Sequence, residues 1–319
     1  MQKKKLKLLK YQQTEIYSKL LGGLISPFYL THTNVNKKYT NEEQQYMHYI
    51  EKKSYIDPNK EVKYPPIAIS MGNFRAGNET YPIPIGTYGN FSFVSAPPKS
   101  KKTFFVSLLS AVYLKGQLDS HAKGMLGHRE GRCLVHFDTE QGRFHAHKVF
   151  RRVVDMTGMD KECYHTFGLR TLNNKDRLNF IEYFLYNKVQ DAGLVVIDGI
   201  ADLVSDVNNL DESSMVIQKL MKWTEELDCH IITVIHSNYG SEKPTGHLGS
   251  YLEKKAETQI QLEINTVNDE MVTVKCKRSR GFPFDKFSFR INKQGQPEIV
   301  DDLFEIIEQK KIDATKAYV

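Results

Sequence analysis

Two adjacent side chains, Lys102 and Thr103, carry the clearest chemistry in the 319-residue chain. They follow an apolar strand and a turn with two prolines, and an apolar helix is predicted to begin at them, in FVSAPPKSKKTFFVSLL (93–109). Backbone N–H groups at the start of a helix favour anions. A lysine there can reach the end of a phosphate chain, and a threonine hydroxyl can hold Mg²⁺. The pair therefore predicts a phosphate-binding site, with ATP and Mg²⁺ as its ligands.

The spacing of this stretch resembles the nucleotide phosphate loop, G-x-x-x-x-G-K-[ST], although neither glycine is present. Ala96 replaces the first glycine, which is a small change, and Lys101 replaces the second. Glycine is preferred at both positions because a Cβ atom crowds the phosphates or the φ angle. The Lys101 stem can point outward and leave the backbone N–H in place, so a working site, a degenerate site and a coincidence all stay open. The residues expected to contact the phosphates are Ala96, Pro97, Pro98, Lys99, Ser100, Lys101, Lys102 and Thr103.

A second motif follows in LVVIDGIADL, where apolar residues lead to Asp198 at the carboxyl end of a predicted strand. A carboxylate there would bind Mg²⁺ together with Thr103 from across the sheet. An ordinary buried strand that ends in an aspartate is the alternative, but the order and separation of the two motifs favour a nucleotide site. Gly199 rather than glutamate comes next, so the base that polarises the attacking water must lie elsewhere.

The elements that position these residues alternate between strands and helices from about residue 83. Continuous apolar strands between helices predict an α/β fold with a mostly parallel sheet covered on both faces. Three later segments alternate apolar and polar residues, as antiparallel strands at a sheet edge do. The predicted strands are NFSFVSA, RCLVHFDT, CYHTFGL, GLVVIDGI and CHIITVIH, then ETQIQLEI, EMVTVKCK and KFSFRI; the predicted helices are 102–115, 142–156, 174–190 and 212–227.

The chain is expected to divide into an accessory segment (1–82), a core (83–300) and a tail (301–319). The accessory segment is rich in Lys, Tyr, Asn and Gln, with helices predicted at Thr14–Leu21 and Asn41–Lys53. The net charge of +6 and a pI near 8.9 suit nucleic acid but equally an ordinary soluble protein. Four scattered cysteines and no secretory or membrane-spanning stretch favour a cytoplasmic protein.

Residues 83 to about 295 resemble the RecA-like ATPase core of the hexameric replicative helicases, closest to plasmid RepA-type helicases and related ATPases of phages and mobile elements. The resemblance rests on APPKSKKTF, HFDTEQG, LVVIDGIADL, VIHSNYG and KCKRSRGFPF. It implies a P-loop ATPase that acts on single-stranded DNA in replication or mobilisation.

The same resemblance assigns two residues to the reaction. In RecA-like ATPases the catalytic glutamate ends the strand beside the aspartate strand, which points to Glu140 as the base, with Asp138 next. The strand that ends at His236 is expected between the phosphate-loop and aspartate strands, where a histidine would sense the γ-phosphate. The long stretch after it, SNYGSEKPTGHLGSYLEKK, is interpreted as a mobile DNA-contacting loop.

In this family a basic pair before a glycine enters the neighbouring subunit's ATP site, and Arg278 and Arg280 match that place. The resemblance thus implies a homo-oligomer, expected as a hexameric ring. Lys275 and Lys277 would support the pair or contact DNA. Two rival functions remain: a nucleotide-binding regulator or scaffold that no longer hydrolyses ATP, favoured by Lys101, and a recombinase-like filament former. His145 and His147 point to different faces of a predicted helix, which argues against a metal site.

Overall fold

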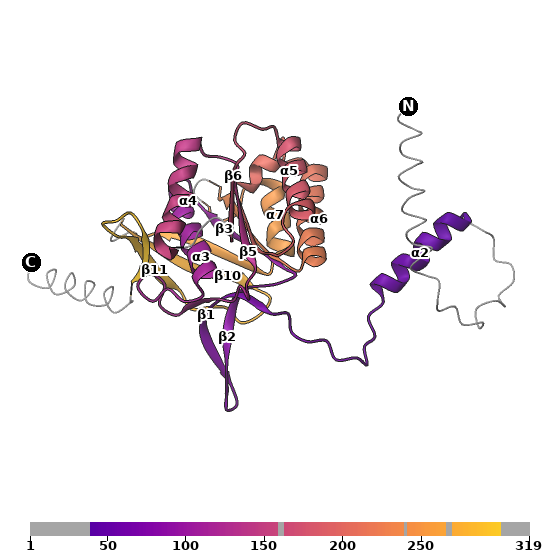
Figure 1. Cartoon of the computed structure of the whole chain (residues 1–319), viewed down its shortest axis with the longest axis horizontal. Helices are drawn as coiled ribbons and strands as arrows, with labels where there is room; N and C mark the ends of the chain where they lie inside the picture. Colours follow the sequence, from indigo (N-terminus) through magenta and orange to yellow (C-terminus); the bar gives the residue numbers. More distant parts are fainter. Residues whose placement is uncertain (1–38, 159–162, 239–240, 266–269, 301–319) are drawn as a thin grey trace, which may run out of the picture. The chain divides into compact units, whose positions relative to one another are not determined.

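The computed structural model describes residues 39–158, 163–238, 241–265 and 270–300. The chain divides into two compact units, with the boundary between Lys63 and Tyr64 (Figure 1). In the first unit, helix α2 (Asn41–Ser54) begins with a reciprocal capping box between Thr40 and Glu43, which confirms the helix predicted there. The helix predicted at 14–21 and the tail at 301–319 lie outside the described residues.

A nine-stranded sheet forms the centre of the second unit. Six of its strands are parallel and lie in the order β9-β3-β8-β7-β5-β6. Beyond β9, three antiparallel strands complete the sheet in the order β10-β11-β12. The mostly parallel α/β fold with antiparallel carboxyl-terminal strands is therefore confirmed. The prediction was wrong for β9, which lies inside the sheet, parallel to β3 and antiparallel to β10. The strands are β3 (Phe91–Ala96), β5 (Cys133–Asp138), β6 (Tyr164–Gly168), β7 (Ala192–Asp198), β8 (His230–His236), β9 (Thr258–Ile264), β10 (Met271–Ser279), β11 (Phe287–Ile291) and β12 (Pro297–Val300).

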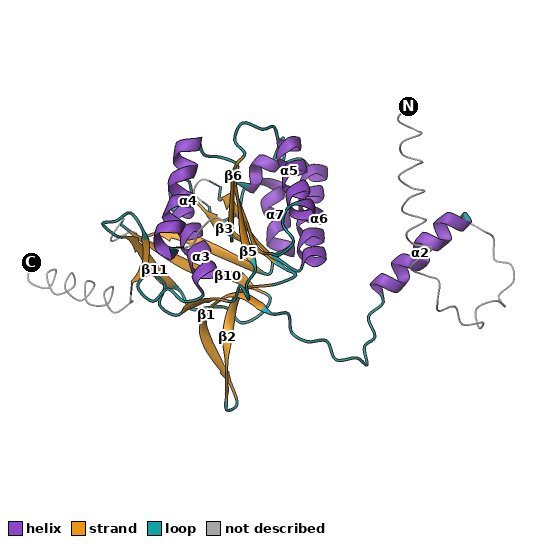
Figure 2. Ribbon diagram, in the orientation of Figure 1, coloured by secondary structure: helices purple, strands orange, loops and turns teal. Residues whose placement is uncertain are grey.

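Helices cover both faces of the parallel strands (Figure 2). The central strands β3, β5 and β7 are buried along their whole length, because their apolar side chains point into both layers. Helices α3 (Lys102–Lys115) and α4 (Arg143–Thr157) share one hydrophobic core with one face of the sheet. Helices α5 (Asn174–Asn187), α6 (Leu210–Leu227) and α7 (Gly246–Lys255) share the second core with the other.

A small three-stranded sheet accompanies the central one. It consists of a long hairpin, β1 (Ile67–Ala76) and β2 (Glu79–Thr87), with the short strand β4 (Met125–Gly127) on its other side. Residues 64–82, which the sequence placed in the accessory segment, thus belong to the same unit as the central sheet. Pro82 and Pro84 hid this hairpin, because proline is tolerated only in edge strands such as β2.

Candidate active site at the carboxyl edge of the sheet

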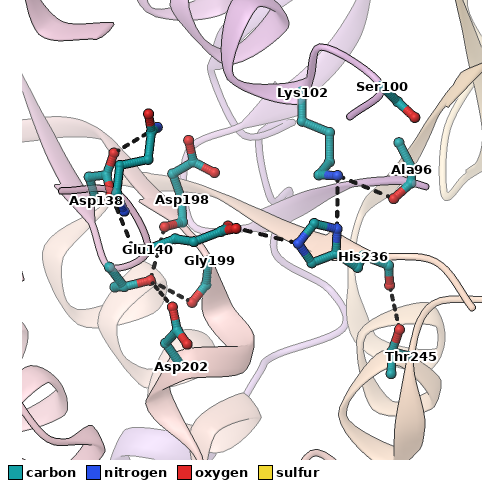
Figure 3. A network of polar contacts seen from close by, with 12 residues as sticks. Ala96, Ser100, Lys102, Asp138, Glu140, Asp198, Gly199, Asp202, His236 and Thr245 are labelled. Atoms are coloured by element: carbon teal, nitrogen blue, oxygen red, sulfur yellow. Dashed lines mark hydrogen bonds and ion pairs between the residues drawn. The ribbon is translucent and has the colours of Figure 1, made fainter. Parts of the chain in front are cut away.

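The topology brings the predicted site residues to one edge. Parallel strands present their carboxyl ends on the same side, and β8 lies between β3 and β7, as the sequence predicted. The residues at or just after the ends of β3, β8, β7 and β5 are Lys102, His236, Asp198 and Glu140. Figure 3 shows these four side chains facing one another.

The phosphate loop keeps its turn without glycine. Lys99 and Lys101 both adopt positive φ angles, of 63° and 59°, where glycine is normally preferred. The Lys101 side chain points away from the loop and its Nζ donates to the carbonyl of Glu270, 2.9 Å away. Ser100 Oγ donates to Pro97 O at 2.8 Å and closes the turn. No side chain caps the start of α3, so its first N–H groups remain suited to an anion.

Lys102 is the most tightly held residue of the loop. It is only 8% exposed, and its Nζ lies 3.3 Å from Ala96 O, 2.9 Å from Pro97 O and 2.9 Å from His236 Nδ1. These three acceptors match the three N–H donors of an ammonium group. Burial lowers the pKa of Lys102, while the nearby carboxylates of Glu140 and Asp198 oppose that shift.

His236 connects Lys102 to Glu140. An ammonium group can only donate, so His236 Nδ1 must accept from Lys102, and the ring proton then lies on Nε2. That nitrogen lies 3.8 Å from Glu140 Oε2 (Figure 3). The polar contact with His236 is the main reason why the pKa of Glu140 lies below its usual value. Glu140 is therefore held as a carboxylate, the form that a general base requires.

Asp198 has the burial and the unpaired oxygen expected of an Mg²⁺ ligand. It is 5% exposed, and its Oδ2 is a buried oxygen without a hydrogen-bond partner among the described residues. Burial, with the carboxylates of Asp138 and Glu140 close by, raises its pKa to about 7, and a hydrogen bond with Thr103 opposes the shift. An unpaired buried carboxylate oxygen beside a hydroxyl fits a hard cation. Thr103 and Asp198 are thus the residues that would hold Mg²⁺.

Asp138 is already committed to the local turn. Its Oδ1 accepts from the backbone N–H groups of Glu140 (3.1 Å) and Gln141 (2.7 Å), and its Oδ2 accepts from Gln141 Nε2 (3.0 Å). The pKa of Asp138 is raised, mainly by burial. This side chain therefore shapes the turn that carries Glu140, and its geometry favours Glu140 over Asp138 as the base.

A brace that the sequence did not indicate joins the ends of β5 and β7. The Thr139 hydroxyl lies 3.0 Å from Asp198 O, 2.8 Å from Gly199 O and 2.8 Å from Asp202 Oδ2. Gly199 has a φ of 105°, and a Cβ atom there would lie 2.3 Å from Thr139 Oγ1. A glutamate at 199 would therefore displace Thr139. The brace thus leaves no room for the base after β7, and the candidate base follows β5 instead. No local pattern could have revealed the brace, because its partners are distant in sequence.

The basic pair lies at the other end of the sheet. Arg280 N donates to Glu257 O, and Glu257 N donates to Phe91 O at the beginning of β3, whereas Lys102 follows its end. Arg280 is exposed, and its Nη2 donates to Lys255 O at 2.8 Å. The pair is therefore remote from the Lys102 site of its own chain, as the sequence suggested, and a role in a neighbouring subunit stays a prediction. Arg278 is also exposed, and Lys275 and Lys277 are paired with Glu263 and Glu242.

The loop after β8 is shorter than the sequence predicted. Residues 246–255 form α7 rather than continuing a loop. Gly249 lies inside this helix because only glycine fits there: a Cβ atom would lie 2.6 Å from Pro244. The Thr245 hydroxyl and N–H both bond His236 O, at 2.9 and 3.0 Å. The strand that carries His236 is thus linked directly to the loop and helix that follow.

Comparisons with known protein families and solved structures give the following similarities. Residues 85–242, just under half of the chain, match the model of a protein family described as an AAA domain. Among solved structures, the chain is similar to the crystal structure of the RadB recombinase, with 17% identity and a TM-score of 0.46 over 67% of this chain and 92% of that chain. No curated protein matches the chain.

Two further observations concern the described part of the chain. Within it, no group of three or more His, Cys, Asp or Glu side chains is arranged to hold a metal ion by itself. A cation at the Asp198 edge would therefore need ligands from a bound phosphate or water. None of the described helices has both the length and the apolar character needed to cross a membrane.

Proposed function

We propose that this protein is an ATPase whose RecA-like core works on single-stranded DNA, in the manner of helicase-like motors of plasmids, phages or mobile elements. The observation that carries the proposal is the convergence of Lys102, Asp198 and Glu140 at one edge of the sheet, where His236 joins Lys102 to Glu140. That edge offers a cation for phosphates, a carboxylate for Mg²⁺ and a carboxylate base.

The proposed mechanism gives each residue one task. The arriving phosphates replace the loop carbonyls and His236 as partners of Lys102 Nζ, so that the ammonium charge meets the β and γ phosphates. Mg²⁺, when held by Thr103 and Asp198, would neutralise phosphate charge. Glu140 accepts a proton from the attacking water. His236 loses its Lys102 contact on nucleotide binding, and it can transmit that change to Glu140 and to Thr245.

Steady-state phosphate release, measured with and without single-stranded DNA, tests this function. The proposal expects release that depends on Mg²⁺ and rises when DNA is added. A protein that binds ATP tightly but releases no phosphate would instead be the nucleotide-binding regulator. That rival is favoured by Lys99 and Lys101, since each left-handed lysine costs about 1–2 kcal/mol that glycine would avoid.

Assembly is the second part of the proposal, with Arg278 and Arg280 acting on the ATP site of a neighbouring subunit in a ring. An arginine donated in this way is worth about 10³-fold or more in rate. Mixing Arg280→Ala protein with Glu140→Gln protein tests it, since each is expected to be inactive alone. Activity should partly return in mixed oligomers that pair an intact Glu140 with an intact Arg280. Co-assembly without recovery would contradict a role in trans, and electron microscopy distinguishes rings from the filaments of a recombinase.

A further inference from the structure

One exposed surface combines an aromatic ring with several cations close to Glu140. Helix α4 begins directly after the turn 138–141, and its outward-facing side chains in the first two turns carry no negative charge. Phe144 is 65% exposed in the first of these turns. The surface consists of Arg143, Phe144, His147 and Lys148, with Arg170 from the loop after β6.

One cation of this surface, Lys148, lies close to the ring. Lys148 Nζ lies 4.6 Å from the centroid of Phe144, and the His145 ring meets the same ring edge-on at 5.4 Å. Arg170, from the loop after β6, lies beside the residue before α4, since a Cβ atom on Gly142 would lie only 3.1 Å from its Nη1. Arg143, Lys148 and Arg170 are exposed, so their charges are available to a partner.

We propose that this surface binds a single strand of DNA, stacking a base on Phe144 and neutralising its phosphates with Arg143, Lys148 and Arg170. The inference rests on the proposed function and names the place where the strand is held. A single strand alternates base faces with phosphates, so it matches an exposed ring flanked by cations. An apolar partner would leave these cations unpaired at the contact, at a cost in free energy.

Because the surface lies next to the turn that carries Glu140, DNA bound there can affect hydrolysis. Asp138 Oδ1 holds the N–H groups of Glu140 and Gln141, and α4 follows at Arg143. A strand that pulls on the first turn of α4 therefore acts on the same turn that aims Glu140 at His236. DNA bound here can change the reach of the base without touching the nucleotide.

The chain offers a matched control on another helix. Tyr183, on α5, is 50% exposed and has Lys188 Nζ 5.6 Å from its ring centroid. It repeats the aromatic–lysine pair, but it lies on α5 directly after Glu182 rather than on α4. Variants at Tyr183 therefore separate a general effect of exposed aromatic residues from an effect of this surface.

The test measures binding of a fluorescent single-stranded oligothymidylate to the full chain, with a non-hydrolysable ATP analogue and Mg²⁺. Phe144→Ala should weaken binding by about tenfold or more, because one stacked base is lost. Phe144→Tyr should retain affinity, and Tyr183→Ala should leave it unchanged. The double variant Arg143→Gln, Lys148→Gln should reduce the slope of log affinity against log salt by about 1.4, which is roughly 0.7 per lost phosphate contact.

A fluorescent reporter locates the strand directly. The single tryptophan, Trp223, is fully buried, so Phe144→Trp adds the one exposed indole, and the oligonucleotide should quench it whereas Tyr183→Trp should not respond. Wild-type binding with full affinity in folded Phe144→Ala protein would overturn this inference and leave the proposed function standing. Failure of the wild type to bind DNA would overturn both. Loss of self-association in Phe144→Ala, without loss of DNA binding, would assign the surface to a second copy of the chain.

Discussion

The two edges of the central sheet carry similar residues in different states. At the amino edge, Glu257 and His230 are buried near Arg280. Both Glu257 oxygens accept hydrogen bonds from Thr87, at 2.9 Å from its N–H and 2.8 Å from its hydroxyl. The His230 ring packs directly against Gly86, and burial lowers its pKa to about 4. At this edge both Glu257 oxygens are satisfied within the chain, whereas His230 Nε2 is buried without a hydrogen-bond partner among the described residues.

At the carboxyl edge, the same kinds of side chain are left ready for a ligand. Asp198 keeps one buried oxygen without a partner, and Glu140 and His236 have side chains that are 60% and 40% exposed. Lys102 is paired with backbone carbonyls and a histidine, which phosphates can replace. Residue types alone thus do not define a site. The exchangeable partners of Lys102 and the exposed side chains of Glu140 and His236 distinguish the carboxyl edge, since buried polar atoms without a partner occur at both edges.

The largest effect that separates the edges should come from Lys102→Ala. Removing the ammonium group leaves the terminal phosphates without their cation, so ATP affinity should fall by about a hundredfold or more, as for the loss of one partner of a buried charge pair. Titration with a fluorescent ATP analogue measures it. Lys101→Gly is the matched control, since Lys101 points away and its left-handed turn suits glycine, so affinity and turnover should be kept or raised. A collapse in Lys101→Gly alone would mean that the wrong lysine has been assigned.

The second-largest effect should be a pH dependence of stability that comes from Asp198 at the carboxyl edge. The folded protein raises the pKa of Asp198 from 3.8 to about 7, so it holds a proton that the unfolded chain has released. The free energy of unfolding should therefore fall as pH rises from about 4 to about 7. Without nucleotide and Mg²⁺, Asp198→Asn should stabilise the protein at pH 8 by up to a few kcal/mol, at about 1.4 kcal/mol per pKa unit, and have little effect below pH 4. Denaturant unfolding at both pH values measures this, and an equal effect at both would contradict it.

Glu257→Gln tests whether the amino edge is purely structural. The amide can present a donor to the Thr87 N–H in place of an acceptor, which should cost about 1–3 kcal/mol of unfolding free energy. The kcat of the folded fraction should stay at the wild-type value. Chemical denaturation and phosphate release on the same preparation give both numbers, and a loss of kcat without a loss of stability would place Glu257 in the reaction.

The smallest expected effect concerns the brace between β5 and β7. Thr139→Val keeps the shape but removes the hydroxyl that reaches Asp198 O, Gly199 O and Asp202. Glu140 should then be aimed less well, so kcat should fall by about tenfold while KM for ATP changes little. Thr139→Ser restores the hydroxyl and should recover most of the rate. A serine variant as slow as the valine variant would show that the methyl group, not the hydroxyl, matters.

Local sequence patterns predict much of this architecture, but some elements and contacts leave no local pattern. The runs around Phe93 and Val195 are apolar enough to predict buried parallel strands, and parallel strands place the residues after them at one edge. The β1–β2 hairpin was hidden by its prolines, and α7 by Gly246 and Gly249, whose small size serves close packing. The contacts of Lys102 with His236, and of Thr139 with Asp202, join distant segments, so only the folded chain reveals them.

Phosphate release by Glu140→Gln protein, with ATP binding measured on the same preparation, tests the central claim most directly. Glutamine keeps the shape of the side chain and can still bond His236, but it cannot take a proton from water. We expect ATP to bind as in the wild type while hydrolysis falls by about two to four orders of magnitude. Hydrolysis at the wild-type rate would contradict the account, because the carboxylate that the β5 turn, His236 and Lys102 surround would then have no part in the reaction.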